Sequence, residues 1–229
     1  MKKLIIIPCY NESENIVKTI TAITRDAPEF DYIIINDCST DNTREICQAH
    51  QFHVIHLPIN LGIGGAVQTG YQYAYLNGYD IAVQVDGDGQ HDPSFLDEMA
   101  LQLTGTPCNM VIGSRFIKKE GFQSSGIRRV GIKYFTWLIK LLTGTTISDP
   151  TSGLRMADRS VIALFAKEYP QDYPEPESVI SILRRQKSVR ELPVIMKARE
   201  GGTSSISPRK SIYYMLSVTL SILIERIRR

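Results

Sequence analysis

The sequence lacks the patterns of disulfide-rich, secreted and membrane-spanning proteins. Its four cysteines form no C-x-x-C pair and no regular ladder of spacings, so we expect reduced thiols rather than a disulfide framework. The apolar run after the first lysines stops at Pro8, which is too short for the hydrophobic segment of a signal peptide. We therefore expect an intracellular protein.

The chain also has little net charge, +2 over 229 residues, so charge gives no argument for a nucleic-acid partner. Basic residues gather after residue 114 and in the last turns, whereas acidic residues dominate the loops of the first half. The length suits one substantial domain with or without an appendage. We predict a domain over residues 1–205 and an amphipathic C-terminal helix over residues 206–229.

Strand and helix patterns alternate four times in the first half of the chain. Apolar, β-branched runs predict buried strands at residues 4–8, 31–37, 52–57 and 80–86. We expect the first helix to begin at an Asn11 or Ser13 cap. Further strands are expected at 110–116, after the loop SDPTSG and at 189–196, with an amphipathic helix at 128–144. This alternation predicts an α/β fold with a doubly wound, mostly parallel sheet.

Three polar clusters follow strands directly: CYNESE, NDCSTDNT and DGDGQHD. Ligands of such sheets bind beyond the carboxyl ends of the strands, so we expect the clusters to meet at one rim. In the third cluster Asp86 and Asp88 form a D-x-D that offers oxygens to one hard cation, with Gln90 as a neutral oxygen ligand. The alternative is a solvated acidic turn before a helix.

Each of the other candidate site residues also has an alternative, purely structural interpretation. Asp37 either accepts hydrogen bonds from a nucleobase or is simply a turn residue. The glycine-rich NLGIGGA either binds phosphate through its backbone N–H groups or is simply the start of a helix. His91 is either a supporting residue beside the D-x-D or a loop residue. Arg115, Arg128 and Arg129 suit phosphate binding or a solvated surface, and Asp149 suits a general base or an Asp-Pro turn.

The C-terminal segment has about thirteen mostly apolar positions (212–224), short of the roughly twenty that span a bilayer. Basic residues bracket this stretch, a pattern typical of a helix in an anionic membrane interface. A core helix or a dimer helix is the alternative. The helix that carries Trp137, with its aromatic residues and lysines, favours membrane contact as well.

Taken together, these segments resemble the family 2 glycosyltransferases of GT-A fold, and most closely the branch of dolichol-phosphate mannose synthases and bacterial undecaprenyl-phosphate glycosyltransferases. The resemblance covers most of residues 4–156. It rests on the segments IIIPCYNESENI, INDCSTDNT, NLGIGGAVQTGY, VQVDGDGQHDP, GSRF, RR at 128–129 and DPTSGLR.

The resemblance implies a role for each matching residue. The nucleotide-sugar would be held by Pro8, Tyr10, Glu12, Asp37, Gly64 and Asp86. The metal, Mg²⁺ or Mn²⁺, would be bound by Asp86, Asp88 and Gln90. Arg115 with Arg128 or Arg129 would hold an acceptor phosphate. The chain departs from many relatives at Ile63, where they have a lysine, and it lacks the long transmembrane hairpin of some lipid-linked members.

The activity implied is inverting, metal-dependent transfer of a hexose, with UDP-glucose as our choice of donor, to polyprenyl (undecaprenyl) phosphate for surface polysaccharide synthesis. A lipid phosphate is already ionised, whereas a hydroxyl acceptor needs a base, for which Asp149 is the candidate. Transfer to a hydroxyl of a lipid-linked polysaccharide and a non-catalytic nucleotide-binding subunit are the alternatives. We expect a peripheral protein on the cytoplasmic face of the membrane, attached by interfacial helices, by a small membrane-protein partner or as a homo-oligomer.

Overall fold

The computed structural model describes residues 1–118, 120–121, 126–171, 174–197 and 219–220, with the backbone alone at 126–128. Along the chain the elements are β1 (Lys3–Cys9), α1 (Ile16–Asp26), β2 (Asp31–Asn36), α2 (Thr43–Ala49), β3 (Val54–His56), α3 (Gly62–Leu76), β4 (Ile81–Gln84), the 3-10 turn η1 (Pro93–Phe95), α4 (Leu96–Gly105), β5 (Met110–Ser114), α5 (Gly126–Thr143), β6 (Arg155–Asp158), α6 (Arg159–Lys167), α7 (Pro174–Arg184) and β7 (Val189–Pro193). Each predicted strand is present.

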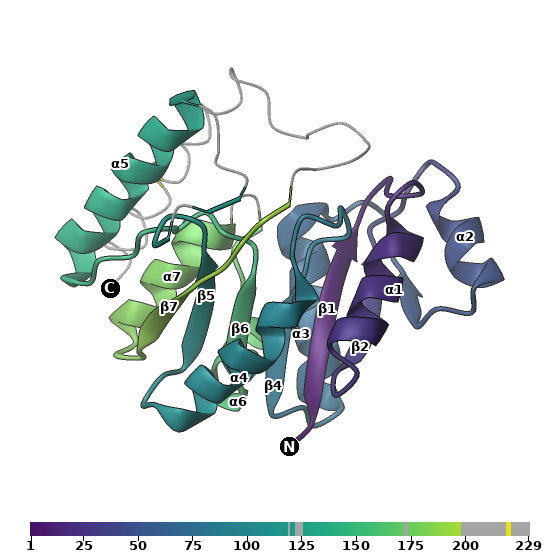
Figure 1. Ribbon diagram of the computed structural model, residues 1–229, viewed down its shortest axis with the longest axis horizontal. Helices are drawn as coiled ribbons and strands as arrows, with labels where there is room; N and C mark the ends of the chain where they lie inside the picture. The colour runs from purple at the N-terminus through teal and green to yellow at the C-terminus, as the bar shows by residue number, and fades with distance from the viewer. Residues whose placement is uncertain (119, 122–125, 172–173, 198–218, 221–229) are drawn as a thin grey trace.

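One seven-stranded sheet runs through the molecule in the order β3-β2-β1-β4-β6-β5-β7 (Figure 1). Its strand pairs are parallel except for those of β6, which runs antiparallel to β4 and to β5. The prediction of a mostly parallel α/β sheet is therefore confirmed.

The reversed direction of β6 brings an additional loop to the carboxyl edge of the sheet. Its first residue, Arg155, pairs with Gln84 at the end of β4 and with Ile112 of β5. The loop before β6 therefore reaches the same edge as the loops that follow β1, β2, β4 and β5. We call this edge the site rim, made of residues 10–15, 37–42, 85–92, 115–118 and 144–154.

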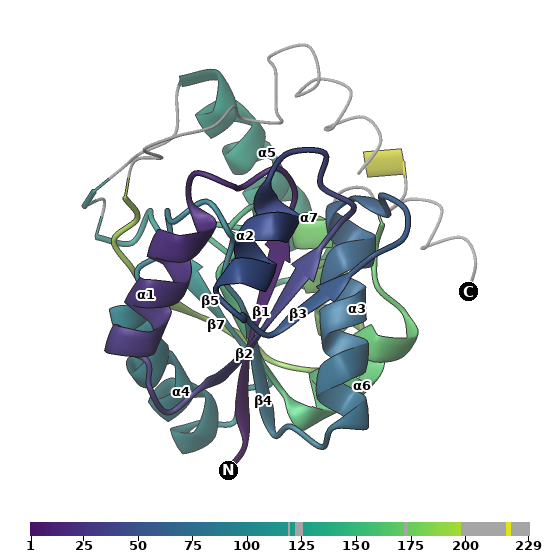
Figure 2. The same cartoon turned by 90° about the vertical axis from the view of Figure 1, so that its right-hand side faces the viewer.

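Helices cover both faces of the sheet. Figure 2 shows α1 and α4 on one side of the strands and α3 and α6 on the other. Alternate residues of β1 enter the two cores: Ile5 and Ile7 pack with α1 and α4, whereas Leu4 and Ile6 pack with α3. Burying each such side chain contributes roughly 1.5–3 kcal/mol, which explains the unbroken apolar run of this central strand.

Helix α3 lies unusually close to β1. A Cβ added at Gly70 would be 2.2 Å from Cγ2 of Ile6, so only glycine fits at this crossing. The close approach fixes α3 against the sheet and, with it, the start of the helix near the site rim.

Two helix boundaries differ from the sequence prediction. Helix α1 begins at Ile16, not at an Asn11 or Ser13 cap. Asn11 has a positive φ of 56°, and its side-chain oxygen accepts a hydrogen bond from the backbone of Thr40 (2.8 Å), so it joins two rim loops instead. The segment YPQDYPEPES predicts a proline-rich acidic loop before a helix, but α7 already begins at Pro174, inside this segment, because proline suits a first helical position.

The predicted interfacial helix over 206–229 lies outside the described residues, apart from positions 219 and 220. Within the described part of the chain, none of the helices combines the length and the apolar character needed to cross a bilayer.

Candidate active site

The D-x-D loop follows β4 and is held by its neighbours in the sheet. Gln84, the last residue of β4, donates from Nε2 to Oδ1 of Asp86 (2.9 Å). The backbone N–H of Asp86 donates to Nδ1 of the buried His91 (3.0 Å), and Nε2 of His91 lies 3.7 Å from Oδ2 of Asp86. His91 therefore holds Asp86 in place through its backbone N–H and lies close to its carboxylate.

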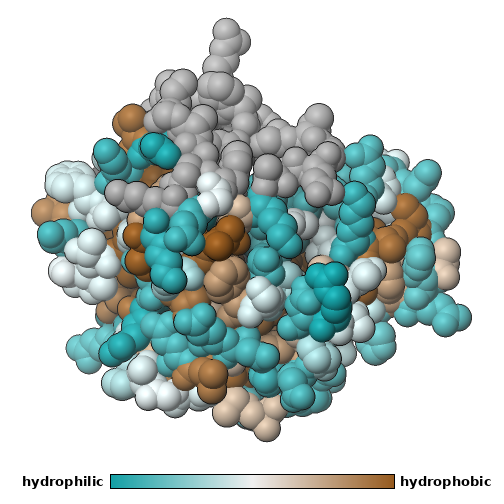
Figure 3. Space-filling view, viewed as in Figure 1, coloured by the Kyte–Doolittle hydropathy of each residue, from teal (hydrophilic) through white to brown (hydrophobic). Residues whose placement is uncertain are grey.

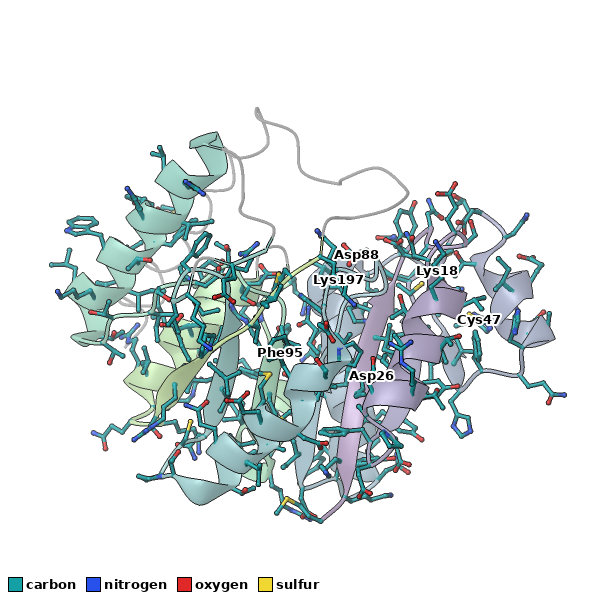
Figure 4. The ribbon with its side chains drawn as sticks, viewed as in Figure 1. Lys18, Asp26, Cys47, Asp88, Phe95 and Lys197 are labelled. Atoms are coloured by element: carbon teal, nitrogen blue, oxygen red, sulfur yellow. The ribbon has the colours of Figure 1, made fainter. Side chains whose placement is uncertain are left out.

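Asp88 and Gln90 form the outer part of this loop. Oδ1 of Asp88 accepts the backbone N–H of Gln90 (3.1 Å), and the side-chain Nε2 of Gln90 donates to the carbonyl of Lys197 (3.2 Å). Figure 4 shows Asp88 near the upper edge of the molecule in this view, with Lys197 beside it. The bond to Lys197 occupies the nitrogen of the Gln90 amide and leaves its oxygen as the end suited to a cation.

A glycine of the 144–154 loop packs directly against the D-x-D. A Cβ added at Gly153 would be 2.7 Å from Oδ2 of Asp86, so any larger residue would displace that carboxylate. The DPTSG segment thus limits the space beside the Asp86 carboxylate, a role that was not predicted for Gly153.

The donor atoms fit a hard divalent cation. Two carboxylates and one amide oxygen are ligands that Mg²⁺ and Mn²⁺ accept, with the rest of the coordination sphere open to phosphate oxygens. Among the described residues no group of three or more His, Cys, Asp and Glu side chains is placed to hold a metal. A cation here would therefore depend on Gln90 or on its substrate for further ligands.

Asp37 lies at the end of β2 and is tied to the start of α3. The residue is only 3% exposed, and its Oδ1 accepts the backbone N–H of Leu61 (2.6 Å). Burial raises the pKa of Asp37, and the backbone N–H groups of Leu61 and Gly62 oppose that shift. A carboxylate desolvated in this way is suited to accept hydrogen bonds from a ligand that enters beside it.

The residues after β1 complete this side of the rim. The carbonyl of buried Pro8 lies 3.3 Å from where a Cβ of Gly87 would be, which brings the β1 and β4 loops into contact. Glu12 is buried, with its backbone N–H bonded to Thr43 (3.0 Å), whereas the ring of Tyr10 is 46% exposed. Pro8, Glu12 and the D-x-D loop are therefore neighbours, and Tyr10 offers an open aromatic face.

Gly64 has a packing role in the structure. Its backbone N–H donates to the carbonyl of Gln171 (3.0 Å), and a Cβ would be 2.1 Å from that oxygen. The N–H that the sequence reasoning gave to a phosphate thus has a protein partner, and a contact between Gly64 and the nucleotide-sugar stays a prediction.

Arg115 and Asp149 form a two-pronged ion pair at the rim. Nε of Arg115 donates to Oδ2 of Asp149 (2.6 Å) and Nη2 to Oδ1 (2.7 Å), and the backbone N–H of Arg115 adds a third bond (3.2 Å). Asp149 is 0% exposed, and the Arg115 side chain is 13% exposed. The sequence reasoning treated these residues separately, as a phosphate ligand and a base, and the structure joins them.

The structure gives less information on Arg128 and Arg129, the other two arginines predicted to bind the acceptor phosphate. Arg129 lies on the exposed side of the first turns of α5. The side chain of Arg128 is outside the described residues. Their assignment to an acceptor phosphate stays a prediction.

Arg155, the last residue of the DPTSGLR segment, is a buried arginine to which the sequence analysis gave no role of its own. Its guanidinium is bonded to the carbonyls of Ser152 (2.7 Å), Pro150 (2.7 Å) and Glu175. It therefore braces the DPTSG loop against the start of α7. Burial raises the pKa of Glu175, although the charge of Arg155 opposes the shift. No periodicity marks Arg155, since it follows the loop as an ordinary strand residue.

Comparison with known proteins identifies the class. The sequence model of Glycosyl transferase family 2 matches residues 4–165. The chain therefore belongs to this family and is a glycosyltransferase, and the family resemblance drawn from its motifs is confirmed.

Among named relatives, an undecaprenyl-phosphate mannosyltransferase of Micrococcus luteus is 30% identical over 216 residues, covering 90% of this chain and 88% of the relative. A polyprenol monophosphomannose synthase of Mycolicibacterium smegmatis is 27% identical, covering 90% and 81%. Each similarity covers 90% of this chain and so extends well beyond the motifs quoted above.

Solved structures agree on the fold. The glucosyl-3-phosphoglycerate synthase of Mycobacterium tuberculosis, solved with Mn²⁺, UDP-glucose and phosphoglyceric acid, superposes with a TM-score of 0.70 at 19% identity, covering 95% of this chain and 79% of that one. This similarity establishes the GT-A fold.

Proposed function

We propose that the protein transfers a hexose from a nucleotide-sugar to polyprenyl phosphate, with inversion, using Mg²⁺ or Mn²⁺. The observation that carries the proposal is the meeting of the D-x-D loop and the Arg115–Asp149 pair at one rim. Gly153 belongs to the loop of Asp149 and touches Asp86, so the two parts of the site are in direct contact.

The names of the relatives support the class of acceptor. The Micrococcus luteus and Mycolicibacterium smegmatis enzymes are both named for transfer to a polyprenyl lipid. Because both relatives are named for the transfer of mannose, a nucleotide-activated mannose is a second candidate donor. Our first choice remains UDP-glucose, which is bound in the similar mycobacterial structure.

The state of Asp149 favours a phosphate acceptor over a hydroxyl. Both of its oxygens accept hydrogen bonds from Arg115, and the residue is fully buried. A carboxylate engaged in this way is poorly placed to take a proton from a sugar hydroxyl. A lipid phosphate is already ionised and needs no base, only a positively charged group to hold it, the role that we propose for Arg115 while it stays paired with Asp149.

In this mechanism the rim holds donor and acceptor on opposite sides of the reacting carbon. Asp37, Tyr10 and Glu12 would hold the nucleotide, and Asp86, Asp88 and Gln90 would hold the cation. When bound, a divalent cation stabilises the negative charge of the leaving diphosphate. Arg115 orients the acceptor phosphate for attack from the far face, which gives a β product from an α-linked donor.

The exposed side of α5 supports a position at the membrane surface. Val130, Trp137 and Leu141 are 66%, 57% and 64% exposed, and Lys133 and Lys140 lie on the same side. In Figure 3 this edge of the molecule mixes hydrophobic and hydrophilic surfaces. Apolar and basic side chains together suit an anionic lipid interface, here the cytoplasmic face of the membrane.

The direct test is transfer of radiolabel from a panel of nucleotide-sugars, including UDP-glucose and an activated mannose, to undecaprenyl phosphate in detergent. Mn²⁺ or Mg²⁺ is supplied, and Asp88→Ala is the control. Metal-dependent product in the lipid phase, absent from the control, is the expected result. Donor binding without lipid product would shift the assignment to a glycan hydroxyl acceptor.

A further inference from the structure

Glu191 makes a set of contacts that none of the roles above explains. It lies on β7, the strand at one edge of the sheet, with β5 as its neighbour. Its Oε2 accepts the backbone N–H of Ser148 (2.8 Å), and its Oε1 accepts both the Ser148 hydroxyl (2.8 Å) and the backbone N–H of Asp149 (2.9 Å). One carboxylate thus receives three donors from two consecutive loop residues.

Those contacts lead directly to the reactive part of the rim. Asp149, whose backbone Glu191 holds, carries the carboxylate that grips Arg115 at 2.6 and 2.7 Å. The Ser148 hydroxyl also lies 2.7 Å from that of buried Ser114, the residue before Arg115. A continuous set of hydrogen bonds therefore runs from Glu191 to Arg115.

These hydrogen bonds control the direction in which the Asp149 side chain points. Fixing the two backbone N–H groups at Ser148 and Asp149 sets the angle at which the Asp149 side chain leaves the turn. A two-pronged guanidinium–carboxylate pair has two parallel bonds and tolerates little rotation. A change in that angle therefore moves the guanidinium of Arg115 or breaks one of its bonds.

We propose that Glu191 is a positioning residue that aims Arg115 at the acceptor phosphate through Asp149. The inference rests on the proposed function, because it gives Arg115 an acceptor phosphate to hold. Glu191 itself touches neither substrate. The competing explanation is that Glu191 only fastens the edge strand to the neighbouring loop.

The kinetic test compares Glu191→Gln with the wild type. The glutamine replaces one acceptor oxygen by an NH₂ group that faces protein donors, so the turn must shift. We expect the KM for undecaprenyl phosphate to rise roughly tenfold, which corresponds to the loss of one good hydrogen bond. The KM for the nucleotide-sugar should stay within about twofold, because the three hydrogen bonds of Glu191 go to Ser148 and Asp149 and not to a nucleotide or metal candidate.

Two further variants sharpen this test. Glu168→Gln is the matched control, since Glu168 forms an exposed pair with Arg185 (2.7 Å) and should leave both KM values unchanged. In an Arg115→Lys background, Glu191→Gln should have little further effect, because the two changes act on one interaction. Full additivity of the two effects would overturn the proposal.

A spectroscopic measurement tests the geometry without any acceptor. The Nε–H resonance of Arg115, assigned by its loss in Arg115→Lys, should shift or broaden in Glu191→Gln and stay in place in Glu168→Gln. If the wild type transfers no sugar to lipid phosphate, the proposed function fails while this resonance still tests Glu191. A lower melting temperature with an unchanged resonance and an unchanged acceptor KM would reduce Glu191 to a structural fastener.

Discussion

At the scale of single residues, the pair of Arg115 and Asp149 is the most consequential interaction of the rim. Replacing one partner of a buried ion pair leaves the other charge without compensation, which costs about 3–5 kcal/mol. We expect Asp149→Asn to lower the free energy of unfolding by an amount of this order and to abolish lipid transfer. Urea unfolding and the transfer assay measure the two effects.

Asp26→Asn is the control for that variant. Asp26 pairs with Arg25 (2.7 Å) on the surface, and Figure 4 shows it well below the rim. We expect no measurable change in stability or transfer. An Asp149→Asn protein as stable as Asp26→Asn would contradict the account of a buried pair.

Asp37 predicts a dependence of stability on pH. Burial raises its pKa in the folded protein above the ordinary value, so the folded state favours the protonated carboxyl. The contribution of Asp37 to the free energy of unfolding is therefore present at low pH and is lost as the pH rises through the folded pKa. Asp37→Asn lacks this dependence, because asparagine does not titrate. The free energy of unfolding of wild type minus that of Asp37→Asn should fall as the pH rises above the ordinary pKa of an aspartate, about 3.9, and should level off above the folded pKa.

Thermal unfolding across this pH range measures the difference. Donor binding by Asp37→Asn should weaken at the same time, although the variant is no less stable near neutral pH. A stability difference that rises with pH would mean that hydrogen bonds to the charged carboxylate outweigh its burial.

At the scale of elements, the loop before β6 is the part that joins donor and acceptor sides. Gly153→Ala would place a methyl group 2.7 Å from a carboxylate oxygen of Asp86. We expect at least a tenfold loss of metal affinity, on the order of 1.4 kcal/mol, in a protein that remains folded. Titration of Mn²⁺ in the presence of nucleotide measures it.

Gly105→Ala is the matched control, because a Cβ there meets nothing within 4 Å. It should bind metal as the wild type does. Unchanged metal affinity in Gly153→Ala would show that Asp86 can move without loss, and would remove the loop from the metal site.

Helix α5 is the element that we expect to touch lipid. Reversing charge at both Lys133 and Lys140 should weaken binding to vesicles rich in anionic lipid, by about 1 kcal/mol for each charge removed near the surface. Lys167→Glu, on the exposed side of α6, is the control and should bind as the wild type does. Cosedimentation at low salt measures the difference, and equal binding by all three proteins would contradict a lipid-facing α5.

The direction of β6 explains what the sequence could predict and what it could not. Asp37, Asp86 and Asp88 were predicted to share a rim because each follows a parallel strand directly. Asp149 was a candidate only as an isolated residue, because nothing in a short strand reveals that it runs antiparallel. Once β6 is reversed, its preceding loop joins the rim and brings Gly153 and Arg155 with it.

Glu191 was hidden for a related reason. It follows the exposed Arg190 in the strand VRELP, where a charged residue at the edge of a sheet is most simply a solvated one. Its partners, Ser148 and Asp149, are more than forty positions away, so spacing carries no signal. Long-range hydrogen bonds of this kind appear only when the strand order is known.

At the scale of the whole molecule, one seven-stranded sheet gathers the site from loops spread over the chain. The parallel strands β1, β2 and β4 bring the nucleotide and metal candidates, and β5, β6 and β7 bring the group around Arg115. The border between β4 and β6 is where the two halves meet, and there the sheet changes from parallel to antiparallel. We therefore expect the nucleotide-sugar and the acceptor to bind on opposite sides of the β4–β6 pairing.

The most direct measurement compares undecaprenyl phosphate with its free alcohol as acceptors for the wild-type enzyme, with the same labelled donor and Mn²⁺. We expect label on the phosphate and none on the alcohol, because the role proposed for Arg115 is to hold an ionised group, and Asp149, bonded to Arg115 through both oxygens, is not available as a base. Equal labelling of the alcohol, or labelling of the alcohol alone, would contradict this expectation.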